Sequence, residues 1–351
     1  MDTLAHDDML LGFAPLGEWL LGPVRMALLT TAIELGIPEL LATTSDADEV
    51  ARQLDAHSGN TRLLLDAMAA MGLAEKHGNA YANSPLAERH LRDGSETNLL
   101  DVIQRMTAMQ HKNLVRLADL VRNGPPPLKQ EDKLENPELW RKAARGLANY
   151  QRSGLAQYAA SLVAALPESA SLKHMLDLGG GPGVVGMAIV ERHPGMTGVL
   201  CDMPNVAETA QAEIAAKGLS NRIRVLSGDY NTLDLGGGFD LVWASHTLYY
   251  AKELDGFMGK LLDCLNPGGV FVSLHEGLEQ GRTRPEYCVL SRLCLALEGQ
   301  DVSFDSGRIA KAMLEAGFQS VESRVVQLSL GSARLDIARK AGRLPGAGAL
   351  A

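Results

Sequence analysis

A glycine-rich segment, Leu176-Asp-Leu-Gly-Gly-Gly-Pro-Gly-Val-Val-Gly, constrains the fold more than any other part of the chain. It joins a short apolar run at His174–Leu178 to a helix-like run at Val184–Arg192. A glycine turn between a strand and a helix is typical of nucleotide-binding sheets, because glycine lets the backbone pass close to a ligand. Gly181-Pro-Gly183-Val-Val-Gly186 also fits the GxGxxG pattern of dinucleotide oxidoreductases, so the loop alone leaves the ligand open.

Strand-like and helix-like runs alternate through the second half of the chain. Apolar strands are expected at His174–Leu178, Gly198–Cys201, Ile223–Leu226, Leu241–Ala244 and Val270–Leu274. Helices are expected between them, near Val184–Arg192, Val206–Lys217 and Glu253–Leu265. This alternation predicts an α/β domain with a parallel sheet and helices on both faces.

The end of the chain follows another pattern. After a helix near Arg308–Ala316, two strand-like runs occur at Val321–Leu330 and Arg334–Ala338. Gly331-Ser332 stands between them, which is a hairpin signal. We therefore expect an antiparallel hairpin to close the parallel sheet.

The first 100 residues have the pattern of a winged helix. Helices are expected at Gly22–Leu35, Ala47–Leu54 and Thr61–Met71, followed by a small hairpin that turns at Gly78-Asn79. This region holds 15 acidic and 6 basic residues, a net charge of −9. The helix that would enter a DNA groove is largely apolar, so we predict a homodimer interface and no nucleic-acid partner.

Residues 101–166 are expected to be helical and to connect the two ends of the chain. Gly124-Pro-Pro-Pro-Leu interrupts them as a loop, and Glu138–Leu166 predicts one long amphipathic helix. Tyr150 on that helix and Met106 before it are candidates for the roof of a substrate pocket. The sequence thus divides into residues 1–100, residues 101–166 and a third domain at residues 167–345.

Composition narrows the classes of protein further. The apolar runs are too short to cross a bilayer, and the acidic start of the chain, with Asp2, Asp7 and Asp8, is unlike a signal peptide. The four cysteines form no CxxC pair, which favours reduced thiols over a disulfide framework or a metal site. A net charge of −9 also argues against nucleic-acid binding. We expect a cytoplasmic protein without a metal or a membrane anchor.

Acidic residues follow three successive strands. Asp177 precedes the glycines, Asp202 ends the next strand, and Asp229 follows the third. A carboxylate at the first position repels a pyrophosphate but attracts the cationic amino group of an amino acid. An acid at the second can accept both ribose hydroxyls, and an acid at the third can accept from an adenine amino group. The set favours a nucleoside joined to an amino acid over a dinucleotide.

The motifs LDLGGGPG, CDMPNV (Cys201–Val206), GDY (Gly228–Tyr230) and NPGG (Asn266–Gly269) resemble those of the small-molecule O-methyltransferases. That class includes the plant caffeate and flavonoid enzymes, hydroxyindole O-methyltransferase and bacterial antibiotic-pathway enzymes. The resemblance covers nearly the whole chain. It implies a Rossmann-like methyltransferase sheet, S-adenosylmethionine as cofactor, a winged-helix dimerisation domain and a small aromatic or polycyclic acceptor.

The resemblance implies that Gly179, Gly181, Asp202 and Asp229 contact the cofactor. Neighbouring residues complete the expected cofactor site, which also includes Asp177, Gly180, Gly183, Met203, Gly228, Tyr230 and Ser245.

A hydroxyl acceptor benefits from a general base, and histidine suits this role near neutral pH. The family places its histidine just after the fourth strand, where this chain reads Ser245-His-Thr-Leu-Tyr-Tyr. Counting back from Asn266 without a gap puts Thr247 at the catalytic position, whereas a gap of one residue restores His246. Glu276 matches the family's supporting acid, and Ser303 replaces a second acid.

Further residues and two other functions stay open at this point. Tyr249, Tyr250 and Tyr287 are candidates for an aromatic pocket, and His275 should point away from its neighbour Glu276 on a regular strand. The run after His246 also resembles bacteriochlorophyll ring C-methyltransferases, which lack the usual histidine. A carbon acceptor, other chemistry with the same cofactor, or a winged-helix regulator with a nucleotide-sensing domain are the alternatives.

Overall fold

The computed structural model describes residues 14–129, 133 and 136–342. The acidic start of the chain lies outside this part, because it falls within the first 13 residues. The predicted end of the third domain, at residues 343–345, also lies outside it. The chain forms two compact units that meet at Gln104 and Arg105.

The first unit is mostly helical. Its elements are α2 (Ala14–Glu34), α3 (Ile37–Leu41), α4 (Ala47–Gln53), α5 (Ser58–Ala70), β1 (Ala74–His77), β2 (Ala80–Asn83) and α6 (Pro85–His90). The strands pair antiparallel with His77 opposite Ala80, so the predicted turn at Gly78-Asn79 is confirmed. Asp46 caps α4 by accepting from the Asp48 N–H, as expected for an acid before a helix. The helices close over a small core that includes Leu65, Met68 and Tyr81.

The second unit begins with helices. These are α7 (Leu100–Leu114, which starts in the first unit), α8 (Leu117–Asn123), α9 (Pro137–Tyr150), a π-helical turn η2 (Gln151–Leu155) and α10 (Ala156–Ala164). The prediction of one continuous helix over Glu138–Leu166 is wrong, because the chain kinks at Gly154, whose φ is 147°. Glycine allows this backbone conformation, which other residues rarely adopt.

The rest of the second unit is a seven-stranded sheet in the order β10-β11-β7-β6-β3-β4-β5. Its strands are β3 (His174–Leu178), β4 (Thr197–Asp202), β5 (Ile223–Ser227), β6 (Phe239–Ser245), β7 (Leu265–His275), β10 (Ser320–Leu328) and β11 (Gly331–Arg339). The five strands β3 to β7 are parallel, and β10 and β11 form the antiparallel hairpin. The predicted fold class is confirmed. The turn is at Ser329-Leu330 and not at Gly331-Ser332, because Gly331 already pairs with Leu328.

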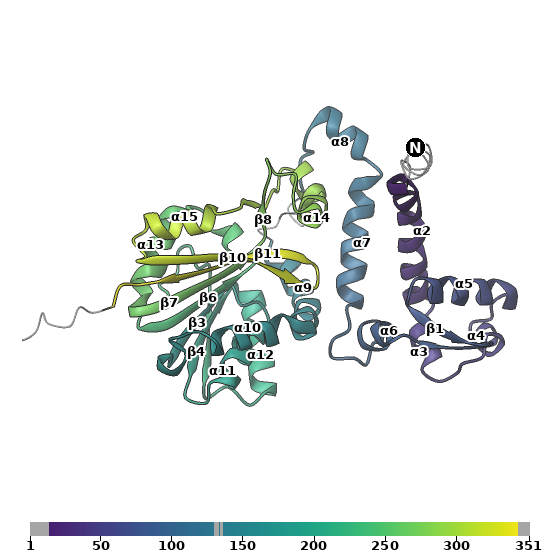
Figure 1. Ribbon diagram of the computed structural model, residues 1–351, viewed down its shortest axis with the longest axis horizontal. Helices are drawn as coiled ribbons and strands as arrows, with labels where there is room; N and C mark the ends of the chain where they lie inside the picture. The colour runs from purple at the N-terminus through teal and green to yellow at the C-terminus, as the bar shows by residue number, and fades with distance from the viewer. Residues whose placement is uncertain (1–13, 130–132, 134–135, 343–351) are drawn as a thin grey trace, which may run out of the picture. The chain divides into compact units, whose positions relative to one another are not determined.

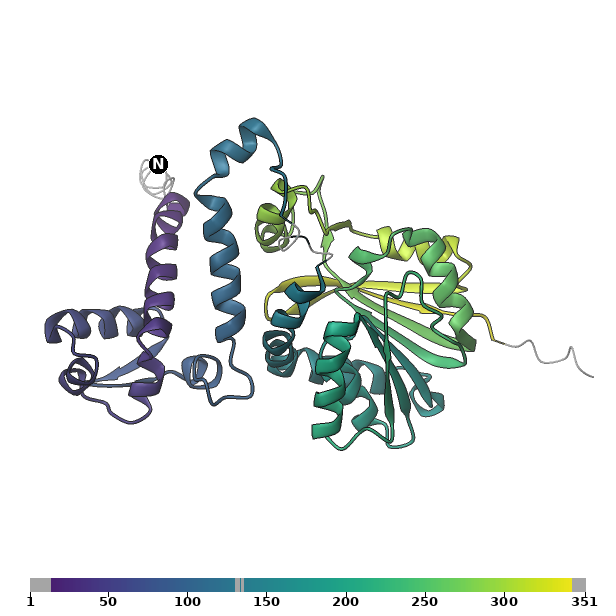
Figure 2. The same ribbon diagram turned by 180° about the vertical axis from the view of Figure 1, so that it is seen from behind.

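Helices cover both faces of the sheet (Figure 1). They include α11 (Val184–Arg192), α12 (Pro204–Ala216), α13 (Leu254–Cys264) and α15 (Arg308–Glu315), whereas α14 (Glu286–Leu297) lies apart from both faces, beside β8 (Gly277–Leu278). Two short 3-10 turns, η3 (Ser169–Ser171) and η4 (Leu248–Tyr250), and a pair of two-residue strands, β8 and β9 (Phe304–Asp305), complete the unit. Both views show α10 beside α11 on one face of the sheet (Figure 1 and Figure 2). The helices α13 and α15 cover the other face.

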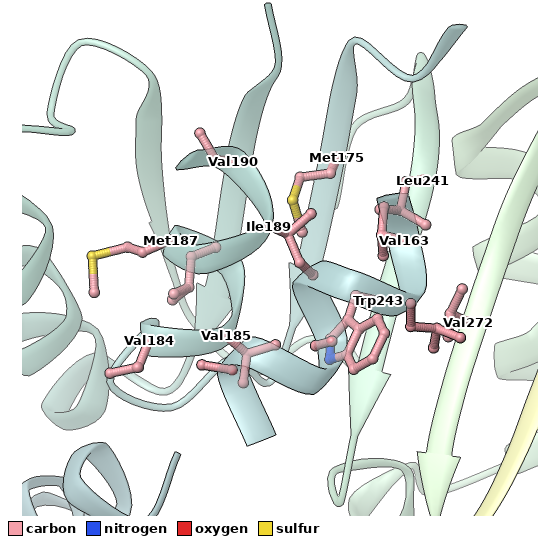
Figure 3. Close-up of a cluster of buried hydrophobic side chains, with 14 of the residues drawn as sticks. Val163, Met175, Val184, Val185, Met187, Ile189, Val190, Leu241, Trp243 and Val272 are labelled. Atoms are coloured by element: carbon pink, nitrogen blue, oxygen red, sulfur yellow. The ribbon is translucent and has the colours of Figure 1, made fainter. Parts of the chain in front are cut away.

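The alternation of side chains along each strand separates two cores. On β6, Leu241 and Trp243 belong to the core beneath α10 and α11, whereas Val242 and Ala244 belong to the core beneath α13. Trp243 is fully buried and lies near Ile189 of α11 and Val272 of β7 (Figure 3). This packing holds the carboxyl ends of the parallel strands in fixed positions, and those ends carry the residues discussed next.

Replacing Ile189 by alanine tests the role of this core. Ile189 is fully buried, so the Ile189→Ala variant leaves a cavity and should lose roughly 2–5 kcal/mol of the free energy of unfolding in urea. Leu314→Ala on α15 is the control, because Leu314 is exposed and should change the free energy by at most about 0.5 kcal/mol. Equal effects of the two changes would contradict the packing described here.

Candidate active site

The glycine loop between β3 and α11 takes a backbone path that side chains would obstruct. Gly179, Gly181 and Gly183 have φ values of 60°, 61° and 82°, in the left-handed region that favours glycine. A Cβ atom on Gly179 would overlap the side chain of Thr247, and one on Gly183 would lie 2.7 Å from Leu200 Cδ1. The loop therefore needs glycine both for its conformation and for its close approach to its neighbours.

Asp177 supports this loop from below. Its carboxylate is buried, and a Cβ would lie 2.6 Å from Asp177 Oδ2 if added to Gly180 and 2.5 Å from it if added to Gly186. Burial, together with the nearby charge of Asp202, raises the pKa of Asp177 to about 7. Asp177 was expected in the cofactor site; its side chain packs against Gly180 and Gly186 and is not among the residues that line the cavity. Gly180 and Gly183 likewise shape the loop without lining it.

Asp202, at the end of β4, ties the loop to the next strand. Its Oδ2 accepts from the Gly181 N–H at 2.8 Å, and its Oδ1 accepts from the Met203 N–H at 2.7 Å. Burial raises the pKa of Asp202 to about 6 in spite of these two hydrogen bonds, which act in the opposite direction. Asp202 and Met203 both line the cavity.

The third acid, Asp229, follows β5. Its Oδ1 accepts from the backbone N–H of Asn231 at 2.9 Å and from Asn231 Nδ2 at 2.7 Å. Burial raises the pKa of Asp229, but these hydrogen bonds and the charge of Lys252 outweigh it, so the pKa lies below its ordinary value. Tyr230 donates its hydroxyl to the Thr247 carbonyl at 2.7 Å and so fixes the segment after β6. The preceding Gly228 shapes the turn without lining the cavity.

These residues surround a cavity of about 810 Å³ at the carboxyl ends of the strands. Its walls combine glycine backbone, carboxylates and aromatic rings, and they include Gly179, Gly181, Asp202, Asp229, Ser245, Trp140 and Tyr250. Trp140 of α9 meets Tyr250 edge to face at 5.6 Å. Gln151 also lines the cavity, and its buried Oε1 has no hydrogen-bond partner among the described residues. An acceptor oxygen without a donor, near the glycine loop, suits the amino group of a ligand.

A second cavity of about 210 Å³ adjoins the first, and Tyr150 and His246 line both. Its walls are mostly apolar and aromatic, with Met106, Tyr287, Leu295 and Leu328 among them. Of the expected pocket residues, Met106 and Tyr150 line this smaller cavity, while Tyr249 and Tyr250 line the larger one. Burial raises the pKa of Tyr150 to about 12, so its phenol is neutral.

His246 stands where the two cavities meet. It has a left-handed backbone with φ of 51°, which turns its side chain out of the regular alternation of β6. Its Nδ1 lies 3.1 Å from Glu276 Oε2, and its buried Nε2 has no partner among the described residues. A carboxylate only accepts hydrogen bonds, so Nδ1 carries the proton and Nε2 is free to accept one.

Glu276 is the centre of a hydrogen-bond network. Its Oε2 accepts from His246, from the Tyr249 hydroxyl and from Arg292 Nη2 at 2.8 Å. Burial raises the pKa of Glu276, but these three donors outweigh it and hold the pKa well below its ordinary range. Glu276 therefore stays ionised and keeps His246 in one orientation.

His275 is the last residue of β7 and directly precedes Glu276. Its ring is buried, and its Nε2 accepts from the backbone N–H groups of Thr247 and Leu248 at 3.1 and 3.0 Å. Burial lowers the pKa of His275 well below its ordinary value, so the ring is neutral. It fixes the turn that follows His246. Thr247 lies against Gly179 and has no contact with Glu276 among those described, so the geometry does not favour the gap-free alignment.

Arg292 and Gln151 were not predicted from the sequence. Arg292 lies on α14, a helix that the sequence pattern did not indicate, and its guanidinium stacks 4.8 Å from the centre of the Tyr249 ring. Gln151 lies in the π-helical turn, within the segment that the sequence predicted to be one continuous helix. In the part of the chain that the structure describes, no group of three potential ligands could hold a metal ion, and no helix is long and apolar enough to span a membrane.

Comparisons with known proteins agree with this geometry. The family of O-methyltransferase dimerisation domains matches residues 18–93, and the family of O-methyltransferase domains matches residues 135–319. A 3-hydroxy-5-methyl-1-naphthoate 3-O-methyltransferase from Streptomyces sahachiroi is 29% identical over 69% of this chain and 70% of that protein. The N,N-dimethyltransferase OxyT from Streptomyces rimosus is 26% identical over 86% and 90%. The crystal structure of human N-acetylserotonin methyltransferase in complex with S-adenosylmethionine covers 94% of this chain and 98% of its own, with a TM-score of 0.76 at 21% identity.

The raised pKa of Asp177 predicts how stability depends on pH. Its pKa of about 7 exceeds the ordinary 3.8, so the folded protein binds this proton more tightly than the unfolded chain. The resulting stability is complete below about pH 4 and is lost as the pH rises through 7. Asp177→Asn should therefore reduce the fall in the free energy of unfolding between pH 4 and pH 7, by about 2–4 kcal/mol in urea titrations.

A carboxylate of opposite behaviour provides the control. Asp255 forms an ion pair with Arg308 at 2.7 Å, and this hydrogen bond lowers the pKa of Asp255. Its contribution to stability is complete above about pH 4 and is lost only as the pH falls further, so Asp255→Asn should leave the fall between pH 4 and pH 7 unchanged. A fall that is the same in Asp177→Asn and in the wild type would contradict the placement of Asp177.

Proposed function

The chain belongs to the O-methyltransferase family, and from this premise we propose that it moves the methyl group of S-adenosylmethionine to a hydroxyl group of a small aromatic or polycyclic metabolite. The observation that carries the proposal is the pair His246–Glu276: His246 lines both cavities, and its Nε2 has no partner among the described residues. When bound, S-adenosylmethionine supplies the activated methyl group.

The larger cavity fits this cofactor. Gly179 and Gly181 leave room for the ligand beside the backbone, and Asp202 and Asp229 present carboxylate oxygens to hydroxyl and amino groups. Gln151 offers an unpaired acceptor near Gly181 for the amino group of the methionine part. Met203, Tyr230 and Ser245 complete the proposed cofactor site, while Asp177, Gly180, Gly183 and Gly228 keep its shape.

The smaller cavity is the proposed acceptor site, and His246 is the proposed base. With the cofactor bound, Nε2 would take the proton of the acceptor hydroxyl while the sulfonium–methyl bond breaks and the thioether S-adenosylhomocysteine leaves, and Glu276 would stabilise the resulting imidazolium. Thr247 and His275 hold the loop in place, and Tyr150 closes the junction between the cavities. Holding the cofactor and the acceptor side by side in the two cavities would supply much of the rate.

The acceptor atom is proposed to be oxygen. A carbon nucleophile on an electron-rich ring attacks without prior loss of a proton, so an oriented base beside the acceptor site favours a hydroxyl group. The relative from Streptomyces sahachiroi is named for 3-O-methylation of a hydroxynaphthoate. OxyT is named for methylation of nitrogen, so overall similarity alone does not decide the acceptor atom.

We propose that residues 1–100 make a homodimer, that residues 101–166 roof the acceptor site and that residues 167–345 carry the chemistry. The exposed apolar side chains of α2 support the first role, since Trp19 and Leu20 are 67% and 77% exposed. Charge disfavours the alternative of a DNA-binding regulator, because Arg62, the one base of α5, is paired with Asp48 at 3.2 Å.

Replacing His246 tests the proposed reaction. His246→Ala should lower the rate of methyl transfer to 3-hydroxy-1-naphthoate by roughly 100- to 10,000-fold, because the hydroxyl loses its base. Calorimetry should show that the variant still binds S-adenosylhomocysteine and that neither protein binds NAD. Thr247→Ser is the matched control and should stay within about threefold of the wild-type rate. Methyl transfer at an unchanged rate in His246→Ala would point to a carbon acceptor, and absence of adenosyl binding would overturn the whole proposal.

A double substitution tests the dimer. Trp19→Glu with Leu20→Glu places two charges on the apolar face of α2, so light scattering should show a dimer for the wild type and a monomer for the variant. Leu314→Glu, which places the same charge on an exposed position of α15, should remain dimeric. A monomeric wild type at tens of micromolar would contradict this proposal.

A further inference from the structure

The acceptor cavity contains a charged group that proton removal from a hydroxyl does not require. Arg292 lines this cavity with its side chain 20% exposed, and among the described residues of the wall it carries the only permanent positive charge. Most of the wall is apolar or aromatic, with Met106, Leu295, Leu328, Leu330 and Ala333. A guanidinium in such surroundings is costly unless its charge and its N–H groups find partners.

The protein supplies only some of the hydrogen-bond partners that this guanidinium requires. Among the described residues, the Arg292 side chain makes one hydrogen bond, from Nη2 to Glu276 Oε2 at 2.8 Å. That oxygen already accepts from His246 and from Tyr249. A guanidinium has five N–H groups, and those that do not face Glu276 remain available to a ligand in the cavity.

The position of the guanidinium is fixed on its other side. Its central carbon lies 4.8 Å from the centre of the Tyr249 ring, which favours a stacked arrangement and limits its rotation. Tyr249 in turn stacks on Phe304 at 5.1 Å. Arg292 is therefore held rigidly beside His246, and both contact the same oxygen of Glu276.

The lining of the cavity favours an aromatic ligand. Tyr150 and Tyr287 contribute two aromatic walls. Gly331 brings the β10–β11 hairpin against Tyr287, since a Cβ on Gly331 would lie 2.7 Å from Tyr287 Cδ1. An aromatic ring on the ligand can make edge or face contacts with these tyrosine rings, which a branched aliphatic chain cannot.

We propose that Arg292 determines specificity by binding a carboxylate on the acceptor, so that the preferred substrate is an aromatic hydroxy acid. Its carboxylate pairs with the guanidinium while its hydroxyl faces His246 Nε2. This inference rests on the proposed function and further specifies that the substrate carries a negative charge. The ion pair between Arg292 and Glu276 neutralises the local negative charge of Glu276, which would otherwise repel such an anion.

Two acceptors that differ only in the carboxylate test this inference. The dissociation constants of 3-hydroxy-1-naphthoate and 2-naphthol are measured by calorimetry with the wild type saturated by S-adenosylhomocysteine. We expect the naphthoate to bind about ten- to hundredfold more tightly, as for a hydrogen-bonded charge pair. In Arg292→Met this preference should fall below about threefold, Arg292→Lys should retain part of it, and Arg324→Met, at an exposed arginine of β10, should leave it unchanged.

Each other result would overturn the inference. If Arg292→Met weakens both acceptors equally, Arg292 only positions Glu276. If the wild type binds both acceptors equally well, the guanidinium does not bind a carboxylate, and this result needs no variant to fold. A preference for the naphthoate that 0.5 M salt does not reduce would also count against an ion pair. In all three cases binding of S-adenosylhomocysteine remains, so the proposed function stands even where this inference fails.

Discussion

The hydrogen bond from Gly181 to Asp202 determines much of what this protein can bind. It joins the glycine loop after β3 to the end of β4, and the buried carboxylate of Asp177 supports the same loop from below. Because the strands are parallel, their carboxyl ends meet at one edge, and the acids that follow them converge there. A cavity with glycine backbone on one side and carboxylates on the other results directly from this topology.

The second determinant is the left-handed residue after β6. With a φ of 51°, His246 leaves the alternation of the strand and turns toward Glu276, and His275 holds the following turn through two backbone N–H groups. Such a conformation is uncommon outside glycine and is retained when its surroundings enforce it. The two histidines thus have separate tasks: His275 is buried and neutral, whereas His246 lines both cavities and its Nε2 has no partner among the described residues.

The sequence predicted the sheet, its order of elements and the closing hairpin, because glycine turns and alternating apolar runs depend on local rules. It also predicted the acids at the strand ends. It did not predict the direction of the Asp177 side chain, the kink at Gly154 or α14, since each depends on packing between segments far apart in the chain. Arg292 was missed for that reason. The choice between His246 and Thr247 required the backbone conformation, which residue counting does not contain.

A crystal structure of the protein with S-adenosylhomocysteine and an aromatic hydroxy acid tests the central claim most directly. The account predicts the adenosyl ligand in the cavity beside Gly179, Asp202 and Asp229, and the acceptor oxygen within hydrogen-bond distance of His246 Nε2. An acceptor oxygen that faces Thr247 or lies remote from His246, or an adenosyl group outside that cavity, would contradict it.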